Sequence, residues 1–351
     1  MKKPPRSFGQ WLLLGVNVSL GIVALLIGTL LIYGNARFNS IDRTTIAAGV
    51  LSPAVAETPI NILLVGSDSR ADFDAKDQKS FGDATRVEGQ RSDSMMLVRI
   101  DPKSDEILVL SIPRDLWVRV TEENIDDKIN QAFDGGPTRL ISTIQENLGL
   151  TVNHFIQVDF SGFRGVVKAI DGVRMYLPFP ARDPITGLSV KTAGCTTLVG
   201  DQALAFVRSR SYQEFRNGRW HTDPTSDFGR IKRQQRFLRQ TFRQSVGKVG
   251  ANLVALDRML TSILATVTVD DTFQRSEMLS LARRLRNVNP EKVVTYVLPV
   301  ISDTAPDKRS ILRLSQQEAT GLLNLFNGFA PGEGAAPTPN PTDAADVAAQ
   351  C

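Results

Sequence analysis

The chain of 351 residues carries 41 Lys plus Arg against 37 Asp plus Glu, and the net charge of +4 is too small to indicate a polyanionic partner by itself. Neither of its two histidines, His154 and His221, has a second histidine or a cysteine at metal-ligand spacing, so we expect neither to bind a metal. Without the two ends of the chain about 270 residues remain, enough for one domain plus a smaller extension.

The N-terminal region contains a long apolar segment. Residues 11–33 include no ionisable residue before their final tyrosine, and this length is enough to span a bilayer as a helix. Lys2, Lys3 and Arg6 come shortly before it. The positive-inside rule therefore predicts that residues 1–10 lie in the cytoplasm.

A cleaved signal peptide is the alternative interpretation of this segment. The apolar run is longer than a normal signal-peptide core, and the cleavage-like Ala-Val-Ala at 54–56 lies too far downstream. We therefore expect a single-pass anchor in the plasma membrane, a linker over residues 34–58, and the rest of the chain on the extracytoplasmic side.

Apolar, β-rich runs alternate with helical patterns over the next part of the chain. Strands are predicted in INILLVGSD, SMMLVRID, EILVLSI, HFIQVDF and GVRMYLP, and helices in NIDDKINQAF, PTRLISTIQENLGL and SGFRGVVKAI. This alternation predicts the α/β class, with a mixed β-sheet covered by helices in an α/β/α sandwich. We place this main domain at residues 59–245.

The pattern becomes mostly helical from Asp223 onward. Phe228, Ile231, Gln235 and Leu238 recur at helical spacing. A mainly helical extension is predicted over residues 246–329, with helices in SEMLSLARRLRNV and after the capping box SQQE, and a strand in KVVTYVLPV.

The two cysteines lie far apart in the sequence. Cys351 ends a tail over residues 330–351 whose Pro/Ala-rich composition predicts disorder. Cys195 and Cys351 could form one disulfide in an oxidising compartment, but we favour two unpaired thiols.

Arginine and aspartate recur together where the first predicted strands begin or end. The pairs are Asp68 with Arg70, Arg91 with Asp93, and Arg114 with Asp115. Ligands of α/β sheets usually bind at such strand ends, so we expect these side chains to meet at one edge of the sheet. Ordinary turn chemistry and mutual salt bridges are the alternatives, although a turn has no need of arginine.

A second group of arginines follows further along the chain. Arg208 and Arg210 are two residues apart, so in an extended segment they would project to one face. Asp227, Arg230 and Gln234 form one stripe of the following helix, for which a surface salt bridge is the alternative. The helix's other arginines are expected on a solvated or membrane-near face; they are Arg233, Arg236, Arg239 and Arg243.

Seven segments occur in the order in which they are found in the LytR-CpsA-Psr family. They are NILLVGSDSR, RSDSMMLVRIDP, LSIPRDLWV, KINQAFDGG, DGVRMYLP, GDQALAFVRSR and DFGRIKRQQRF. The resemblance covers about Pro59 to Ser245. This chain departs from the family's pattern in a longer, charged insertion over residues 71–90 and in Phe206, where the family often has tyrosine.

The resemblance implies an enzyme, a phosphotransferase that moves a glycan polymer from a polyprenyl phosphate or pyrophosphate carrier to peptidoglycan through a phosphodiester. It implies that the pyrophosphate is bound by Arg91, Arg114, Arg208, Arg210, Arg230 and Gln234, to which the strand-end pattern adds Arg70. It also implies that Asp68 and Asp93 bind a metal. Arginine suits such a group because its planar fork can bind phosphate through two hydrogen bonds.

The chemistry of phosphoryl transfer leads to the same residue types. It needs charge neutralisation and alignment, which arginines and a divalent ion supply, and Mg²⁺ or Mn²⁺ suits a site with few carboxylates. We therefore take Arg114, Asp68, Asp93 and Asp227 as the catalytic candidates. The three aspartates remain open as the general base.

Two other functions are compatible with parts of the sequence. One is a non-catalytic module that binds the lipid carrier or the wall. The other is a membrane-bound transcriptional attenuator, but an external arginine cluster would not meet nucleic acid, and no helix-turn-helix pair is found. The sequence does not indicate an oligomeric state.

Overall fold

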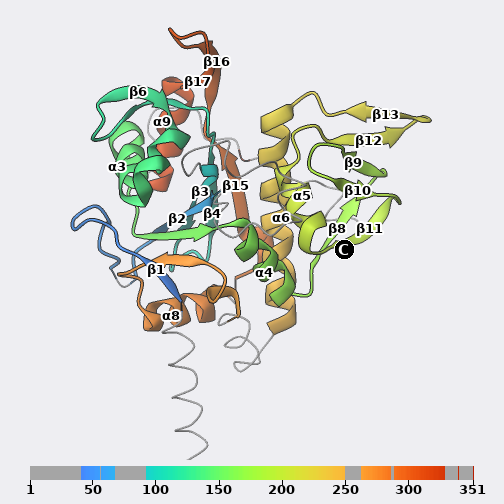
Figure 1. The fold of residues 1–351 in the computed structure, drawn as a ribbon. Helices are drawn as coiled ribbons and strands as arrows, with labels where there is room; N and C mark the ends of the chain where they lie inside the picture. The colour runs from blue at the N-terminus through green and yellow to red at the C-terminus, as the bar shows by residue number, and fades with distance from the viewer. Residues whose placement is uncertain are drawn as a thin grey trace, which may run out of the picture. The chain divides into compact units, whose positions relative to one another are not determined.

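The three apolar runs that were predicted as the first strands are neighbours in the central sheet (Figure 1). The structure is a computed structural model that describes residues 41–55, 57–67, 92–249, 262–285 and 288–328, together with Pro339 and Cys351. The three strands form an antiparallel meander of β2 (Ile60–Ser67), β3 (Ser92–Ile100) and β4 (Ile107–Ile112).

Four further strands complete a seven-stranded sheet within the described residues. They are β1 (Asp42–Thr44), β7 (His154–Val158), β14 (Thr268–Asp270) and β15 (Val293–Val297). The strand order is β1-β14-β7-β2-β3-β4-β15. β2 pairs parallel with β7 and β4 parallel with β15, whereas β14 pairs antiparallel with β7. The predicted mixed sheet is confirmed.

Helices cover both faces of this sheet (Figure 1). One face packs against α3 (Gly136–Leu148) and α9 (Gln316–Phe326) in the larger core, to which β2 contributes Leu63 and Val65. The other face packs against α6 (Ser226–Val249), next to Leu64 of β2. The central strands are apolar on both sides because neither face meets water.

A second core lies on the far side of α6 from the sheet and includes Phe237 of that helix. It is built by α4 (Phe160–Ala169), α5 (Gly200–Arg208), a ribbon of β8 (Val173–Leu177) and β11 (Gly194–Leu198), and a small sheet. The small sheet has the order β10-β9-β12-β13 and contains β9 (Ala181–Asp183), β10 (Leu188–Val190), β12 (Gln213–Arg216) and β13 (Arg219–Thr222). Helix α6 is therefore packed on two sides.

The helix predicted over residues 124–133 is not formed as such. This segment contains strand β6 (Ile125–Lys128), which pairs with β5 (Trp117–Val120), and then a 3-10 helix, η2 (Ile129–Gly135). Asn124 has a φ of 54°, a left-handed turn conformation that reverses the chain between β5 and β6. The prediction relied on helical periodicity and overlooked this turn.

The prediction of a mainly helical extension over residues 246–329 is also wrong. The segment contains helices α8 (Arg275–Leu285) and α9, but β14 and β15 are members of the central sheet. It also forms the short η3 (Pro290–Lys292) and a hairpin of β16 (Val300–Thr304) and β17 (Ser310–Leu314). Residues 42–351 form one compact unit, and the predicted boundary at 245 falls inside α6.

The predicted anchor, residues 11–33, lies outside the described residues, as do residues 34–40 and 56 of the predicted linker and all of the predicted tail except Pro339 and Cys351. The rest of the linker is described, and its residues Asp42–Thr44 form β1 of the central sheet. Within the described ranges no helix is both long enough and apolar enough to cross a membrane.

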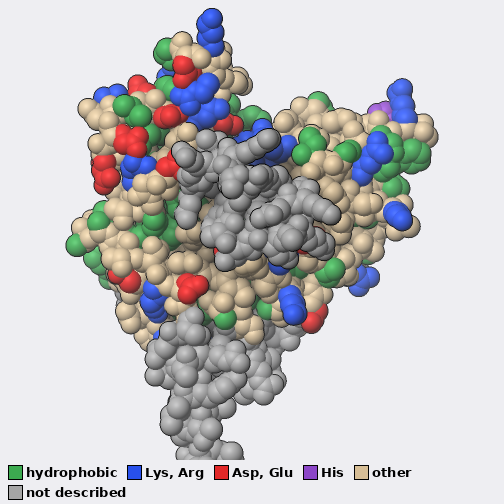
Figure 2. Space-filling model, viewed as in Figure 1, with side chains coloured by type: hydrophobic (Ala, Val, Ile, Leu, Met, Phe, Trp, Pro, Cys, Tyr) green, Lys and Arg blue, Asp and Glu red, His purple; other side chains and the backbone are tan. Residues whose placement is uncertain are grey.

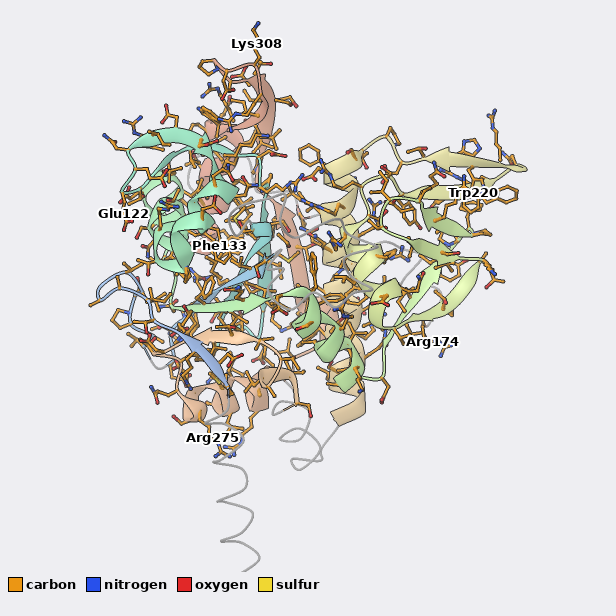
Figure 3. The ribbon with its side chains drawn as sticks, in the orientation of Figure 1. Glu122, Phe133, Arg174, Trp220, Arg275 and Lys308 are labelled. Atoms are coloured by element: carbon orange, nitrogen blue, oxygen red, sulfur yellow. A yellow bond between two sulfur atoms is a disulfide. The ribbon has the colours of Figure 1, made fainter. Side chains whose placement is uncertain are left out.

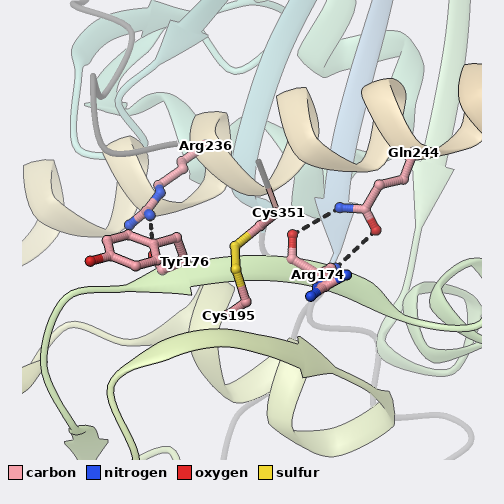
Figure 4. The surroundings of a disulfide bond; sticks show 6 residues. All are labelled: Arg174, Tyr176, Cys195, Arg236, Gln244 and Cys351. Atoms are coloured by element: carbon pink, nitrogen blue, oxygen red, sulfur yellow. Dashed lines mark hydrogen bonds between the residues drawn. A yellow bond between two sulfur atoms is a disulfide. The ribbon is translucent and has the colours of Figure 1, made fainter. Parts of the chain in front are cut away.

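Cys195 and Cys351 are joined in a disulfide, so the expectation of two unpaired thiols is wrong (Figure 4). Cys195 lies on β11, opposite Tyr176 of β8. Beside it, Gln244 of α6 exchanges two hydrogen bonds with the backbone of Arg174 on β8, at 2.9 and 2.8 Å. The disulfide therefore attaches Cys351 to the β8–β11 ribbon, which packs along α6.

Candidate active site

Asp227 lies at the centre of a cluster of arginines in the first turn of α6. Its Oδ2 accepts a hydrogen bond from the guanidinium group of Arg230 at 3.1 Å. Its Oδ1 lies 3.0 Å from Nε of Arg210 and 3.9 Å from Nε of Arg114. The Arg230 side chain is only 5% exposed, so this predicted pair is not an ordinary surface salt bridge.

Strand register explains why Arg114 reaches this place. Met95 of β3 pairs with Ile112, the last residue of β4, so the turn that carries Arg114 lies at the same edge of the sheet as the start of β3. Leu116 closes the turn by donating a backbone hydrogen bond to Pro113 at 3.1 Å. Arg114 is thus brought to the start of α6, next to Asp227.

Arg208 and Gln234 lie beside this cluster. The Arg208 guanidinium carbon is 4.1 Å from the ring centre of Phe160, a cation–π contact with the start of α4. Gln234 donates from Nε2 to the Val207 backbone oxygen at 3.1 Å and accepts from Oγ of Ser94 at 3.3 Å. Gln234 therefore connects the end of α5 to β3.

The segment between Arg208 and Arg210 is held from two sides. Asp183 of β9 accepts hydrogen bonds from Oγ of Ser209 at 2.5 Å and from the Ser211 backbone at 3.0 Å. Burial opposes ionisation of Asp183, but these bonds and two from the backbone of its own turn outweigh it and lower the pKa of the carboxyl. Arg233 donates to the Ser209 backbone oxygen at 2.7 Å from the other side.

A cavity of about 840 Å³ opens beside the arginines and extends between the central sheet and the helices α4, α5, α6 and α8. Arg114, Arg208, Arg210, Arg230 and Gln234 all contribute to its lining. The remainder is mostly aliphatic and aromatic, and Met96 and Val98 of β3 are examples. The size is typical of a ligand-binding cavity.

The later arginines of α6 were predicted on a solvated or membrane-near face, and the solvated alternative is wrong. The Arg233 side chain is 9% exposed and bonds Asp223 at 2.7 Å, and Arg236 donates to the backbone of Tyr176. Arg239 donates to Oγ1 of Thr295 at 2.6 Å, and Arg243 pairs with Glu291. These arginines connect α6 to the layers on its two sides.

Four of the predicted site residues belong to the segment between Ser67 and Ser94. Asp68, Arg70 and Arg91 lie outside the described residues, and of Asp93 only the backbone, in β3, is described. In the β2–β3 ladder Gly66 pairs with Ser94 and Ser67 with Ser92, so Asp93 is the extra residue of a bulge. In sequence, Asp68 directly follows Ser67.

In the described part of the chain, no group of three or more His, Cys, Asp or Glu side chains is arranged to hold a metal ion. Both oxygens of Asp227 are close to arginines.

His154 lies between two carboxylates of the fold. It is buried between Asp270 of β14, at 3.2 Å from Nδ1, and Glu277 of α8, at 3.0 Å from Nε2. Burial lowers the pKa of His154, but the two carboxylates more than compensate and raise it. The imidazole ring stacks on Phe273 at 3.9 Å between centres.

Asp183, Arg233 and Phe160 were missed by the sequence analysis. Asp183 lies in ARDPITG, which is typical of a turn, and Arg233 looks like one of many arginines of a basic helix. Only the fold brings Asp183 to Ser209. The sequence Ser-Arg-Ser at 209–211 could have indicated a buried acceptor nearby, because the two serines that flank Arg210 can both donate hydrogen bonds.

Fold and site together define an α/β/α protein in which an arginine cluster adjoins a mostly apolar cavity, which suits an amphiphile with an anionic head group. The chain belongs to the LytR-CpsA-Psr family, whose model, described as the LytR_cpsA_psr family, matches residues 33–326.

Named relatives agree with this assignment. The chain is 29% identical over 310 residues to the "Probable cell wall biosynthesis protein LcpB" of Corynebacterium glutamicum, over 88% of this chain and 69% of that protein. It is 28% identical over 286 residues to the "Polyisoprenyl-teichoic acid--peptidoglycan teichoic acid transferase TagU" of Bacillus mycoides, over 76% of this chain and 82% of that protein. The structure of a LytR-Csp2A-Psr enzyme from Actinomyces oris shares the fold, with a TM-score of 0.65 at 23% identity over 86% of this chain and 99% of that one.

Proposed function

We propose that this protein transfers a glycan polymer from a polyprenyl phosphate or pyrophosphate carrier to peptidoglycan, and joins the two through a phosphodiester. The single observation that carries the proposal is the long apolar cavity lined at one end by Arg114, Arg208, Arg210 and Arg230. The names of the relatives from Corynebacterium and Bacillus support a role in wall assembly and a transferase activity.

The cavity suits a polyprenyl chain in shape as well as in polarity. Ser94, Met96, Val98 and Ile100 are alternate residues of β3, and all four line it. Six residue steps along a strand correspond to about 20 Å. The cavity is therefore long enough in this direction to take an extended hydrocarbon chain with its phosphate near the arginines.

The proposed reaction is a displacement at phosphorus. A hydroxyl oxygen of peptidoglycan attacks the phosphorus attached to the donor sugar, and a new P–O bond forms. With a pyrophosphate carrier, the bond from this phosphorus to the oxygen that bridges the two phosphates breaks, and its electron pair leaves with the polyprenyl phosphate. The hydroxyl proton passes to a carboxylate or to the leaving phosphate, and guanidinium groups neutralise the charge that develops on the phosphate oxygens.

We propose different roles for the three candidate aspartates. Asp227 orients Arg114, Arg210 and Arg230, since its two oxygens face them. We propose that Asp68 and Asp93 hold Mg²⁺ or Mn²⁺, which would supply further neutralisation of phosphate charge when bound. Mutation of each carboxylate in turn tests which of the three acts as the general base.

We further propose that residues 11–33 anchor the chain in the plasma membrane and that the domain acts on its extracytoplasmic side, where peptidoglycan lies. The attenuator alternative loses support, because the basic helix α6 is packed on two sides and its arginines contact protein groups. The other alternative, a non-catalytic module that binds lipid or wall, would show no turnover, whereas a transferase would.

The test is incubation of the full-length chain in detergent with a polyprenyl-pyrophosphate-linked glycan, a peptidoglycan fragment and Mg²⁺. The proposal predicts glycan joined covalently to the fragment over several turnovers, and loss of the product in excess chelator. Binding of the donor without any covalent product would instead indicate the non-catalytic module.

A further inference from the structure

The small sheet β10-β9-β12-β13 has two chemically different faces. Its register places Ala181, Asp183, Leu188 and Val190 on the face that packs into the second core, and all four are buried. The same pairings identify the residues of the opposite face, because the side chains of directly paired residues in an antiparallel ladder point to the same side. This outer face carries Arg182, Ser189, Gln213, Phe215, Trp220 and Thr222.

The outer-face side chains are arranged by contacts with one another. The Arg182 guanidinium carbon lies 4.1 Å from the ring centre of Trp220, and Nε of Arg182 donates to Gln213 at 2.7 Å. Phe215 lies across the hairpin from Trp220, with ring centres 5.3 Å apart. Gln213 also donates to Oγ1 of Thr222 at 3.1 Å. The face is thus a preorganised combination of two rings, a guanidinium, an amide and a hydroxyl.

These rings remain accessible. Phe215 is 39% exposed, Trp220 is half-buried, and Ser189 and Thr222 are exposed. The hairpin extends away from α6 with Trp220 on it (Figure 3), and hydrophobic and basic side chains gather at this end of the surface (Figure 2). Exposed aromatic rings bordered by polar groups often mark a binding surface.

In the sequence, the β12–β13 hairpin lies between Arg210 and Arg230, two members of the arginine cluster. Gln213 follows Arg210 by three residues, and Thr222 precedes Asp227 by five. Three extended residues span at most about 11 Å, so the outer face begins close to Arg210. Asp183, on the inner face, also binds Ser209 and Ser211, which fixes the sheet to the arginine-bearing segment.

We propose that this outer face binds the glycan strand of peptidoglycan that accepts the transferred polymer, an inference that rests on the function proposed above. Pyranose rings present flat C–H faces that stack on aromatic rings, and acetamido, hydroxyl and carboxylate groups match Gln213, Thr222 and Arg182. Arg182 is the one charged side chain among these outer-face residues, so the face is complementary to the carboxylates of the stem peptides.

The acceptor fits this face better than the donor glycan does. The lipid of the donor would occupy the cavity and its phosphates would meet the arginines, whereas the acceptor must approach from outside. A polymer of repeating phosphates would call for a continuous row of cations. Two rings with one stacked guanidinium instead suit sugar rings that carry isolated carboxylates.

The test uses the full-length chain in detergent and insoluble peptidoglycan from which other glycopolymers have been removed. Trp220→Ala should weaken co-sedimentation with this material by about tenfold, the order expected for loss of an aromatic anchor, and Trp220→Phe should largely restore it. In transfer assays Trp220→Ala should raise the apparent KM for long strands and leave kcat within about twofold. Transfer to a single disaccharide should be unchanged.

Ile301→Ala is the matched control, since Ile301 is 58% exposed on the other projecting hairpin, β16–β17, and this variant should bind as the wild type does. Arg182→Gln provides a second disruption of the face if Trp220→Ala lowers the melting temperature. Unchanged sedimentation of both variants would overturn the proposal, as would weakened binding of the donor glycan in place of peptidoglycan. Absence of transfer by the wild type would contradict the proposed function, whereas sedimentation would still test this face.

Discussion

At the scale of single residues, the account depends on the geometry of the arginines. Lysine at position 114 or 208 keeps the positive charge but loses the planar fork that can contact two phosphate oxygens. If these groups stabilise charge in the transition state, Arg114→Lys and Arg208→Lys should each lose about 2 to 4 kcal/mol of transition-state stabilisation, a rate loss of about 30- to 900-fold.

The measurement is single-turnover transfer, with the melting temperature as the folding control. Arg119→Lys is the matched variant, because Arg119 is 51% exposed and pairs with Asp126 away from the cavity lining. It should remain within about 0.5 kcal/mol of wild type in stability and unchanged in rate. Lysine variants of Arg114 and Arg208 that match this control would show that charge alone suffices.

The buried His154 predicts a dependence of stability on pH. Its pKa is raised in the folded protein, so its contribution is fully present below the unfolded value of about 6.5 and is lost as the pH rises through the folded value. The pKa of Asp270 is lowered, so its contribution is present above its unfolded value and is lost as the pH falls through the folded one.

Chemical unfolding of wild type and His154→Gln at pH 5.5 and pH 8.5 checks this prediction. The substitution should destabilise the protein by about 1 to 3 kcal/mol at pH 5.5 and by less at pH 8.5. An equal effect at both values would mean that the charged form of His154 contributes nothing.

At the scale of elements, the cavity makes its own prediction. Val98 of β3 lines it, and a larger side chain there would occupy space assigned to the lipid chain. Val98→Phe should reduce the amount of polyprenyl lipid that copurifies with the protein by more than about tenfold, at a cost of about 1 to 3 kcal/mol in stability from overpacking. The measurement is lipid per protein by mass spectrometry. Full lipid content in this variant would place the lipid elsewhere.

The elements themselves differ in how well the sequence predicted them. β2, β3, β4, β7 and α3 follow from local periodicity, because each is apolar in a pattern that only one secondary structure can bury. The helix α9 was expected from a capping box, and Ser315 is indeed its N-cap residue, but its side chain makes no capping hydrogen bond. Packing of Leu322 and Phe326 into the larger core is a sufficient reason for this helix.

The candidate site was predictable in its residue types and less so in its supports. Three arginines meet at Asp227, namely Arg114, Arg210 and Arg230. Side chains at strand ends commonly form the binding site of an α/β sheet, so the position of Arg114 could be predicted. The roles of Arg233 and Asp183 depend on the second core, whose position against α6 has no local signal. For this reason the arginines of α6 were predicted to face solvent or the membrane, although the helix is packed on two sides.

At the scale of the whole molecule, long-range pairing was the main feature that the sequence did not reveal. β14 and β15 join the central sheet next to β7 and β4, strands that precede them by more than a hundred residues. Nothing in the sequence specifies such partners. The segment after residue 245 was therefore taken for an extension, although it completes the sheet.

The disulfide between Cys195 and Cys351 predicts a global effect on stability. It closes a loop with a sequence separation of 156 residues, and in the chain-entropy model a loop of this size restricts the unfolded state strongly. Cys351→Ser should destabilise the oxidised protein by about 2 to 5 kcal/mol. Denaturant midpoints measured with and without reductant check this, and reductant should have no effect on the variant. A wild-type midpoint that is insensitive to complete reduction would contradict the prediction.

The central claim is that the enzyme moves a sugar-linked phosphate from a lipid to peptidoglycan, and the fate of that phosphate tests it most directly. The donor is labelled with ³²P at the phosphate next to the sugar and incubated with the full-length chain, Mg²⁺ and peptidoglycan. The account predicts that the label becomes covalently attached to peptidoglycan and that unlabelled polyprenyl phosphate is released. Label that leaves with the lipid or as inorganic phosphate, with glycan nevertheless attached to the wall, would contradict it.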